Sequence, residues 1–300
     1  MNRELPSCAI ESGHLPMNSA STHTEGSAQT PRARSLVIPR EHGAWGILLV
    51  PLVTGASVGM FAEVRVLPLL LFIAAALALF WMRTPVESWL GTSPLKAQTA
   101  AEKNAVLAAI GALASVAAIC LTVLLWNGRN SGLLRLGAIT GLAFVVQAGL
   151  KKLGRSTRMA AQLIGAIGLT STAPAAYYVV TGQLDTRALA LWLANWLFAG
   201  NQIHFVQLRI HAARAAGWSE RFARGRVFFA GQIVMIVALL VAWRANMMPL
   251  LTLAAFLPVL WRGTAWFLGP AQPLAVRRLG WSELAQALAF GVLLVAAFLF

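Results

Sequence analysis

The sequence is poor in charge. Only 11% of its 300 residues are Asp, Glu, Lys or Arg, whereas an ordinary soluble domain has about 25%. A soluble globular protein of this size needs more charged residues on its surface, so the low charge excludes a soluble enzyme. The two cysteines, Cys8 and Cys120, exclude a disulfide framework and a cysteine-based zinc site. Acidic residues are the scarcest charged type, and Asp185 is the sole aspartate.

Apolar residues are abundant instead. They make up 58% of the chain, and its mean hydropathy is +0.69. A membrane-spanning helix needs about 20 mostly apolar residues, and stretches of that length recur from Gly43 onward. The sequence therefore predicts an all-α fold, a polytopic membrane bundle of about nine transmembrane helices. The expected spans are 43–61, 64–82, 105–126, 133–150, 161–181, 188–208, 227–243, 246–261 and 283–300.

Residues 1–38 differ from everything that follows. They are rich in Ser, Thr, Pro and Gly and contain no apolar run of signal-peptide length. We expect them to form a disordered cytosolic tail ahead of a transmembrane helix-bundle domain at 39–300. The segment 262–282 is expected to be a loop or a partly inserted segment.

The basic residues are unevenly distributed around the predicted spans. The net charge of +14 would suggest a nucleic-acid partner in a soluble protein, but membrane proteins accumulate Lys and Arg on the cytosolic side. Nineteen of the 24 fall on the side that carries the N-terminus, and five fall on the other. This distribution predicts an integral membrane protein, expected in a bacterial inner membrane, with a cytosolic N-terminus and an external C-terminus. No nucleic-acid partner is needed.

The spans also contain spaced small residues. Gly55 and Gly59 are four residues apart in the first span, and Gly137 and Gly141 are four apart in the fourth. Each pair places bare backbone on one helix face, which favours close helix packing.

Polar side chains concentrate in the sixth span. Such residues are costly in a bilayer, so they are candidates for function. At about 100° per residue they form two stripes, which must face the bundle interior or a wet cavity. The first stripe is Asn201, His204, Gln207 and His211, and the second is Asn195, Gln202 and Arg209. The stripes are compatible with a binding wall and equally with hydrogen bonds between helices.

Three other segments contain polar residues that are candidates for function. Arg40, Glu41 and His42 crowd the start of the first span, where Glu41 also suits the helix dipole. A loop begins at Arg83, after the second span. In the fifth span Pro174 removes a backbone hydrogen bond, and nearby hydroxyls can satisfy the freed carbonyls or contact a ligand.

These patterns lead to a hypothesis for one cytosol-side cavity. We expect His42, Asn201, His204 and Gln207 to line it, with Arg83 and Arg209 at its mouth. The full set of candidate substrate-binding residues is Arg40, Glu41, His42, Arg83, Asn201, Gln202, His204, Gln207 and Arg209. No catalytic residue or cofactor is predicted. No metal site is predicted either, because His204 and His211 lie roughly 10 Å apart along a helix, which is too far for one metal ion to bind both.

Two resemblances bear on identity. The PREHGAWG stretch, Pro39 to Gly46, resembles the signature of YwiC-like integral membrane proteins, and GAIGLTSTAPAAYY and NQIHFVQLRIH follow in matching order. That family implies a class without an assigned activity. The helix count and orientation also resemble UbiA-type prenyltransferases, in which aspartate-rich motifs after helices two and six hold Mg²⁺ and a diphosphate. The corresponding segments here begin at Arg83 and Arg209, and neither motif is present.

Three functions follow as alternatives. The first is a UbiA-like bundle that binds an isoprenoid or lipid in a cytosol-facing intramembrane cavity, with or without catalysis. The second is a transporter or permease of a small molecule, and the third is a membrane accessory protein. A cavity that opens sideways to lipid would favour the first, and a polar path through the bundle would favour the second.

Overall fold

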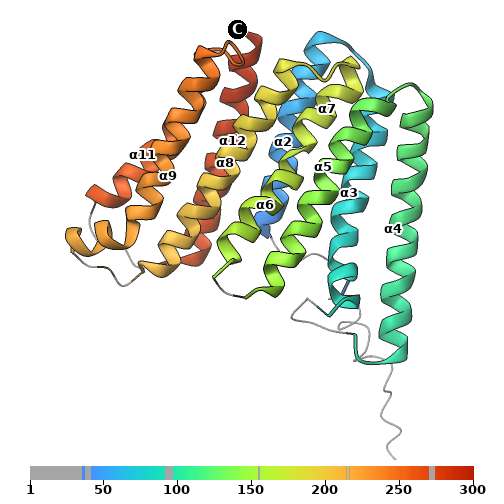
Figure 1. Cartoon of the computed structure of the whole chain (residues 1–300), viewed down its shortest axis with the longest axis horizontal. Coiled ribbons are helices and arrows are strands. Elements are labelled where there is room, and N and C mark those ends of the chain that lie inside the picture. The colour runs from blue at the N-terminus through green and yellow to red at the C-terminus, as the bar shows by residue number, and fades with distance from the viewer. Residues whose placement is uncertain are drawn as a thin grey trace, which may run out of the picture.

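The computed structural model describes residues 36–37, 42–91, 97–154, 156–213, 215, 217–269 and 274–300. Within these residues every regular element is a helix, so the all-α bundle expected from the sequence is confirmed (Figure 1). The helices are α2 (His42–Ala62), α3 (Val66–Trp89), α4 (Ala100–Trp126), α5 (Asn130–Lys152), α6 (Arg158–Thr170), α7 (Thr172–Thr181), α8 (Thr186–His211), α9 (Trp218–Arg244), α10 (Thr252–Ala255), α11 (Leu257–Leu268) and α12 (Val276–Leu299).

Seven segments among the described residues are long and apolar enough to cross a membrane. They are α2, α3, α4, α5, α6 with α7, α9 and α12. The other two predicted spans correspond to α8 and to α10 with α11. Helix α8 is long but rich in polar side chains, and α11 has only 12 residues. The chain is thus a multi-pass membrane protein.

Several helix ends differ from the predicted ones. Helix α3 continues through Pro85 to Trp89, so Arg83 lies on a helix and the loop predicted to begin there is wrong. One proline removes a single backbone hydrogen bond, which the turns on either side tolerate. Helix α11 extends to Leu268 and α12 begins at Val276, so much of 262–282 is helical.

The predicted tail lies outside the described residues except at its end. Leu36 and Val37 are helical, and Leu36 is buried. The backbone carbonyl of Val37 accepts a hydrogen bond from the Trp81 indole at 2.9 Å, and that of Leu36 accepts one from the Ser88 hydroxyl at 3.4 Å. These two residues therefore pack on the charged end of α3.

Helix α8 lies among other helices. It packs on α2, α6, α7 and α9, and its buried residues include Asn195, Asn201 and Gln202. The prediction that its polar stripes face the bundle interior is confirmed for these residues. The main apolar core forms around α8 from residues of α9, α10, α12, α2 and α7, with Phe198 stacked on Phe290 at 3.9 Å between ring centroids.

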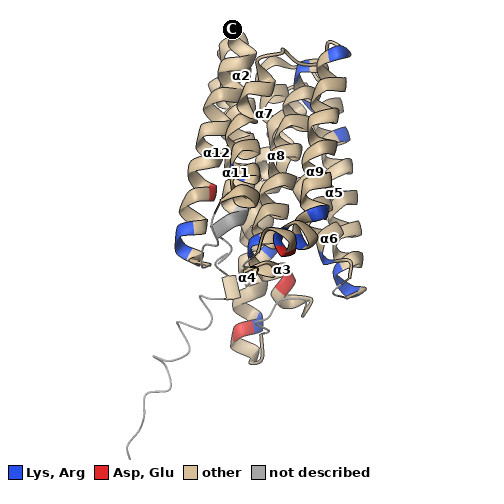
Figure 2. Cartoon of the chain, turned by 90° about the vertical axis from the view of Figure 1, so that its left-hand side faces the viewer, with Lys and Arg blue, Asp and Glu red and all other residues tan. Residues whose placement is uncertain are grey.

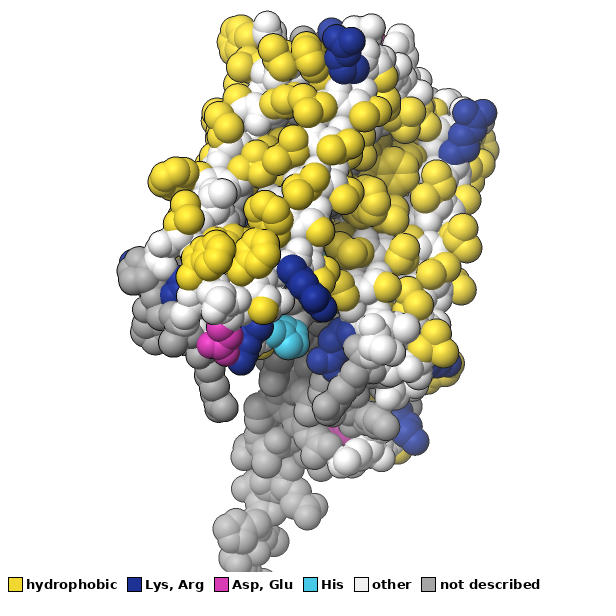
Figure 3. Space-filling view, turned by 60° about the vertical axis from the view of Figure 1, so that its left-hand side comes forward, with side chains coloured by type: hydrophobic (Ala, Val, Ile, Leu, Met, Phe, Trp, Pro, Cys, Tyr) yellow, Lys and Arg dark blue, Asp and Glu magenta, His cyan; other side chains and the backbone are white. Residues whose placement is uncertain are grey.

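Charged residues gather at one end of the bundle (Figure 2). The described Lys and Arg at that end are Arg83, Lys103, Lys151, Lys152, Arg158, Arg209, Arg221, Arg224, Arg226, Arg262, Arg277 and Arg278, whereas Arg65, Arg129, Arg135, Arg187 and Arg244 belong to the other end. The C-terminus lies at the sparsely charged end (Figure 1). Apolar side chains cover most of the face seen in Figure 3, as expected for a surface in contact with lipid.

Helices α2 and α7 approach each other at glycines. A Cβ on Gly55 would lie 2.0 Å from the Ala173 carbonyl oxygen, and one on Gly59 would lie 3.2 Å from Val180 Cβ. The close packing predicted for this glycine pair is confirmed. The same prediction for Gly137 and Gly141 is wrong, because no atom lies within 4 Å of a Cβ built on either of them.

We predict that Gly55→Ala lowers the free energy of unfolding by about 1–3 kcal/mol, as overpacking at a tight contact does. Gly111→Ala on α4 is the matched control, since a Cβ there meets nothing within 4 Å. Thermal unfolding in detergent, followed by tryptophan fluorescence, makes the comparison. Equal midpoints for the two variants would contradict the α2–α7 packing.

Candidate functional site

A groove runs along the bundle between α3 and α5, with α6 and α7 behind it. Its volume is about 760 Å³ and it is partly open. Small-molecule sites in proteins occupy roughly 300–1,000 Å³, so the groove is large enough for a ligand. Its lining is mainly apolar and includes Phe72, Ala75, Ala76, Leu79 and Phe80 of α3, Leu133, Leu136, Gly137, Gly141 and Phe144 of α5, and Gly168, Leu169 and Ala175 of α6 and α7.

The groove is elongated along the helix axes. Its lining extends from Phe72 to Val86 on α3 and from Leu133 to Gln147 on α5. At a helical rise of about 1.5 Å per residue, each stretch is roughly 21 Å long. Gln147 and Val86 lie toward the charged end, whereas Leu133 lies toward the other. The groove thus has a mainly apolar lining, with Arg83 and Gln147 among its residues toward the charged end of the bundle.

The glycines of α5 shape one wall of the groove. Gly137 and Gly141 both line it, and the space above each is empty to 4 Å. Any larger residue there would project its side chain into open groove space. The spacing that predicted helix packing therefore widens a cavity instead.

The back of the groove contains the break between α6 and α7. The Thr170, Ser171 and Thr172 hydroxyls donate to the carbonyls of Ala166 (2.7 Å), Gly168 (2.6 Å) and Leu169 (2.9 Å). These hydroxyls therefore bond to backbone carbonyls in the turns before Pro174. The carbonyl that Pro174 leaves without its usual donor is that of Thr170, so its predicted satisfaction by a hydroxyl stays a prediction. Ser171 and Thr172 also line the groove, so they place hydroxyl groups in its otherwise apolar wall.

Ion pairs connect α3 and α5 at the charged end of the bundle. Glu87 Oε1 lies 3.0 Å from Arg83 Nε and 2.9 Å from Lys151 Nζ. The side chains of Arg83 and Glu87 are each 20% exposed, and that of Lys151 is 39% exposed. Arg83 lines the groove itself, and among the predicted site residues whose side chains are described it alone does so. Charged side chains therefore lie next to the groove at this end, in contrast to its mainly apolar lining.

Asn201 and Gln202 of α8 belong to a separate, buried polar cluster. Asn201 Oδ1 accepts a hydrogen bond from Arg262 Nη2 at 3.1 Å, and Gln202 Nε2 donates to the Glu283 carbonyl at 2.9 Å. Arg262 also pairs with the Glu283 carboxylate. The Arg262 guanidinium lies 4.1 Å from the centre of the Phe205 ring, a cation–π contact.

The remaining predicted residues of α8 have other neighbours. The His204 ring makes an edge contact with Phe228 of α9, with 5.4 Å between centroids. Gln207 Nε2 donates to Gln162 Oε1 of α6 at 3.3 Å. Arg209 is partly buried in the last turn of α8. Ligand binding by these side chains stays a prediction, and they lie apart from the lining of the groove.

The three predicted residues at the start of the first span are Arg40, Glu41 and His42. Arg40 and Glu41 lie outside the described residues, and His42 is described as the first residue of α2 by its backbone alone. Among the residues that the structure does describe, no group of three or more His, Cys, Asp or Glu is placed to hold a metal ion.

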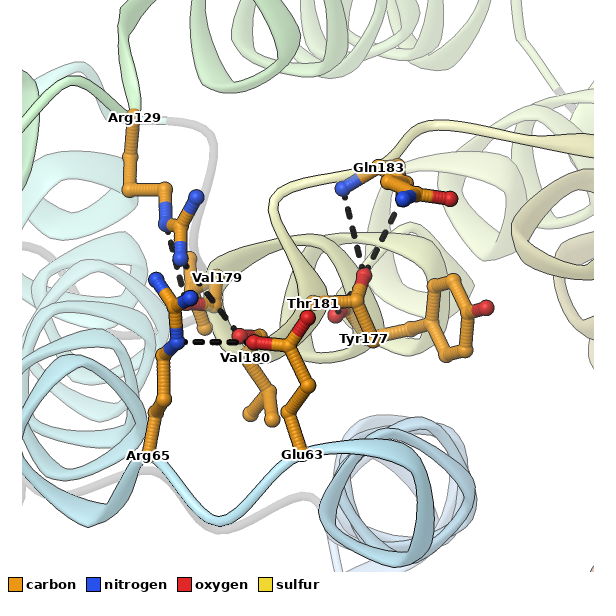
Figure 4. Close-up of polar contacts among 8 residues, drawn as sticks. All are labelled: Glu63, Arg65, Arg129, Tyr177, Val179, Val180, Thr181 and Gln183. Atoms are coloured by element: carbon orange, nitrogen blue, oxygen red, sulfur yellow. Dashed lines mark hydrogen bonds and ion pairs between the residues drawn. The ribbon is translucent and has the colours of Figure 1, made fainter.

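Figure 4 shows polar contacts at the opposite end of the bundle. Arg129 Nε donates to the Val179 carbonyl at 3.2 Å, and Arg129 Nη2 lies 3.5 Å from the Val180 carbonyl. These carbonyls belong to the last turn of α7, where a cation suits the helix dipole. Arg129 thus caps α7, and Arg65 pairs with Glu63 nearby at 2.7 Å.

The Arg262–Glu283 pair was not anticipated from the sequence and has a clear energetic consequence. We predict that Glu283→Ala lowers the free energy of unfolding by about 3–5 kcal/mol, because it leaves the Arg262 charge buried without its partner. Glu220→Ala is the control: it breaks the exposed Glu220–Arg224 pair of 2.6 Å and should cost about 0–1 kcal/mol. Thermal unfolding of both variants tests this, and equal losses would contradict it.

The comparisons with known proteins give one match. A sequence model of the YwiC-like protein family matches residues 38–177. No curated protein and no solved structure matched the chain. The matched segment includes the Pro39–Gly46 motif and nearly all of the GAIGLTSTAPAAYY stretch, whereas NQIHFVQLRIH lies beyond it. The family resemblance is thereby confirmed, and residues 38–177 of this membrane protein are YwiC-like.

Proposed function

We propose that this protein binds the hydrocarbon chain of an isoprenoid or other membrane lipid in the groove between α3 and α5. The observation that carries the proposal is the groove itself, a mainly apolar cavity of about 760 Å³ with Arg83 and Gln147 in its lining toward the charged end. An amphiphile in the bilayer has the same arrangement of apolar chain and polar head. A groove about 21 Å long accommodates most of such a chain.

The position of the groove within the sequence supports the proposal. All its lining residues, from Leu48 to Ala175, fall inside the YwiC-like segment 38–177. The polar cluster of α8, α11 and α12 falls outside that segment. The part of the chain that matches the family therefore contains a complete candidate site, and this site does not require the residues of α8.

The shape of the groove favours binding over transport. Its lining ends at Leu133 and Leu134 near the start of α5, where α7 is capped by Arg129. On the side of α2, Leu48 lines the groove, and Gly55 of the same helix packs against Ala173 of α7. A permease would need a polar path to both surfaces. The mainly apolar lining of the groove does not provide such a path.

The charge distribution supports an orientation for the bundle. Lys and Arg favour the cytosolic side of a membrane, so the charged end of the bundle faces the cytosol of a bacterial inner membrane in this proposal. We expect a C-terminal alkaline phosphatase fusion to be active and a C-terminal fluorescent protein that folds only in the cytosol to be dark. The reverse pattern would contradict the orientation.

Filling the groove tests the binding proposal. We predict that Gly137→Leu reduces the lipid that co-purifies with the protein, because the new side chain projects into the open groove. Gly111→Leu is the matched control, since Gly111 is equally open but lies on α4 away from the groove lining. Native mass spectrometry after mild detergent extraction measures the lipid-bound fraction, and thermal unfolding verifies that both variants are folded.

We expect the lipid-bound fraction to fall at least severalfold for Gly137→Leu and to stay at the wild-type level for Gly111→Leu. Titration with farnesol and oleyl alcohol, both uncharged, then distinguishes an isoprenoid from an acyl-chain preference. Equal lipid retention by wild type and both variants would contradict binding in the groove.

A further inference from the structure

We infer that the groove selects ligands with an uncharged head group that both donates and accepts hydrogen bonds, as an alcohol does, and that Gln147 contacts this group. The inference rests on the proposed function, because the head group belongs to a molecule whose chain lies in the groove. It adds the chemistry of the polar part of the ligand, which the apolar lining does not specify.

Gln147 lies at one end of the groove lining. On α5 the lining extends from Leu133 to Gln147, and Gln147 is its last residue toward the charged end. It precedes Lys152, the last residue of α5, by about one and a half helical turns. A polar amide at this end, with apolar residues from there to Leu133, matches a ligand that has one polar end and an apolar chain.

The amide of Gln147 is free to bind a ligand. The other polar side chains of the lining have partners within the protein. They are the Arg83–Glu87 ion pair, the Thr140–Ser171 hydroxyl pair at 2.8 Å, and the Thr172 hydroxyl, which donates to the Leu169 carbonyl at 2.9 Å. Gln147 is half-buried, and its amide has no hydrogen-bond partner within the part of the chain that the structure describes.

Gly165 of α6 fixes the position of this amide. A Cβ on Gly165 would lie 2.7 Å from Gln147 Cδ and closer still to Gln147 Nε2, so the amide lies directly against the bare backbone of α6. Both residues line the groove. The amide is therefore held in the groove wall, between α5 and α6, by packing and not by a hydrogen bond.

The chemistry of an amide determines which head group fits. A glutamine side chain offers two N–H donors and a carbonyl acceptor, and it carries no charge. A hydroxyl group accepts from such an amide and donates to it. A hydrocarbon that filled the groove would cover the amide without giving it a partner, which costs free energy away from water. The groove should therefore prefer an alcohol to a bare hydrocarbon of the same chain.

The test compares oleyl alcohol, oleyl methyl ether and octadecene with the full-length protein in nanodiscs. Each competes with a diazirine-bearing hydrocarbon that has no head group, and the mole fraction that halves photolabelling of α3 and α5 measures its affinity. We expect wild type to need a roughly three- to tenfold lower mole fraction of the alcohol than of octadecene, as one net hydrogen bond provides. The ether accepts but does not donate, so it should compete less well than the alcohol.

Two variants remove or displace the amide. Gln147→Met keeps the approximate size of the side chain and should bring the ratio of octadecene to alcohol close to one, while competition by octadecene is not weakened. Gly165→Ala leaves Gln147 in the chain but pushes its amide away from α6, so it should also lower the ratio. A Gly165→Ala variant with the wild-type ratio would overturn the role of Gly165.

Matched controls exist for both variants. Gln162→Met removes an amide of α6 that pairs with Gln207 and does not belong to the groove lining. Gly168→Ala adds a methyl group to the lining at an ordinary contact distance of 3.5 Å from Thr140. Both should keep the wild-type ratio, and thermal unfolding verifies that all four variants are folded.

The remaining outcomes distinguish this inference from the proposed function. Equal competition by oleyl alcohol and octadecene in wild type would overturn the head-group inference and leave the groove as a chain-binding site. Equal competition by the ether and the alcohol would overturn the requirement for a donor. A preference for the alcohol that survives Gln147→Met would overturn the assignment of Gln147. Absence of competition by all three compounds would contradict the proposed function itself.

Discussion

The contact between α2 and the broken helix α6–α7 determines the shape of the part of the bundle that contains α2 to α7. Gly55 brings the backbone of α2 against that of Ala173, closer than any side chain would permit. Helix α7 also packs on α3, α5 and α8, so it fixes the positions of the helices around it. Because α3 packs mainly on α4 while α5 packs mainly on α6, the space between α3 and α5 stays unfilled. The groove follows from this division of contacts.

The polar residues of α8 satisfy a different physical requirement. In a bilayer, buried polar groups need partners within the protein. Asn195 donates to the Thr54 hydroxyl at 3.1 Å, and Asn201 accepts from Arg262. These interactions connect α8 to α2 and α11. The buried polar contacts around α8 are thus separate from the mainly apolar groove between α3 and α5, where we propose that the ligand binds.

Much of the architecture was predictable from hydrophobic runs and charge. Nine of the described helical segments correspond to the nine expected spans, and the interior position of the α8 stripes followed from the cost of exposing Asn201 or Gln202 to lipid. The site was less predictable. Spacing alone does not say whether Gly137 faces a helix or a void, since that depends on which helix lies opposite. Likewise Arg262, in the expected loop segment, and Glu283, the first residue of the last expected span, are 21 residues apart and meet because α11 and α12 turn back on each other.

The most direct test of the account is to map where a lipid chain lies on the protein. A fatty alcohol with a diazirine in the middle of its chain, activated by light in native membranes, labels the residues that the chain contacts. The account predicts that peptide mapping finds concentrated labelling on α3 between 72 and 86 and on α5 between 133 and 147, with excess unlabelled oleyl alcohol suppressing it. Labelling spread evenly over the outer faces of α4, α9 and α12, without suppression by the competitor, would contradict the groove as a lipid-binding site.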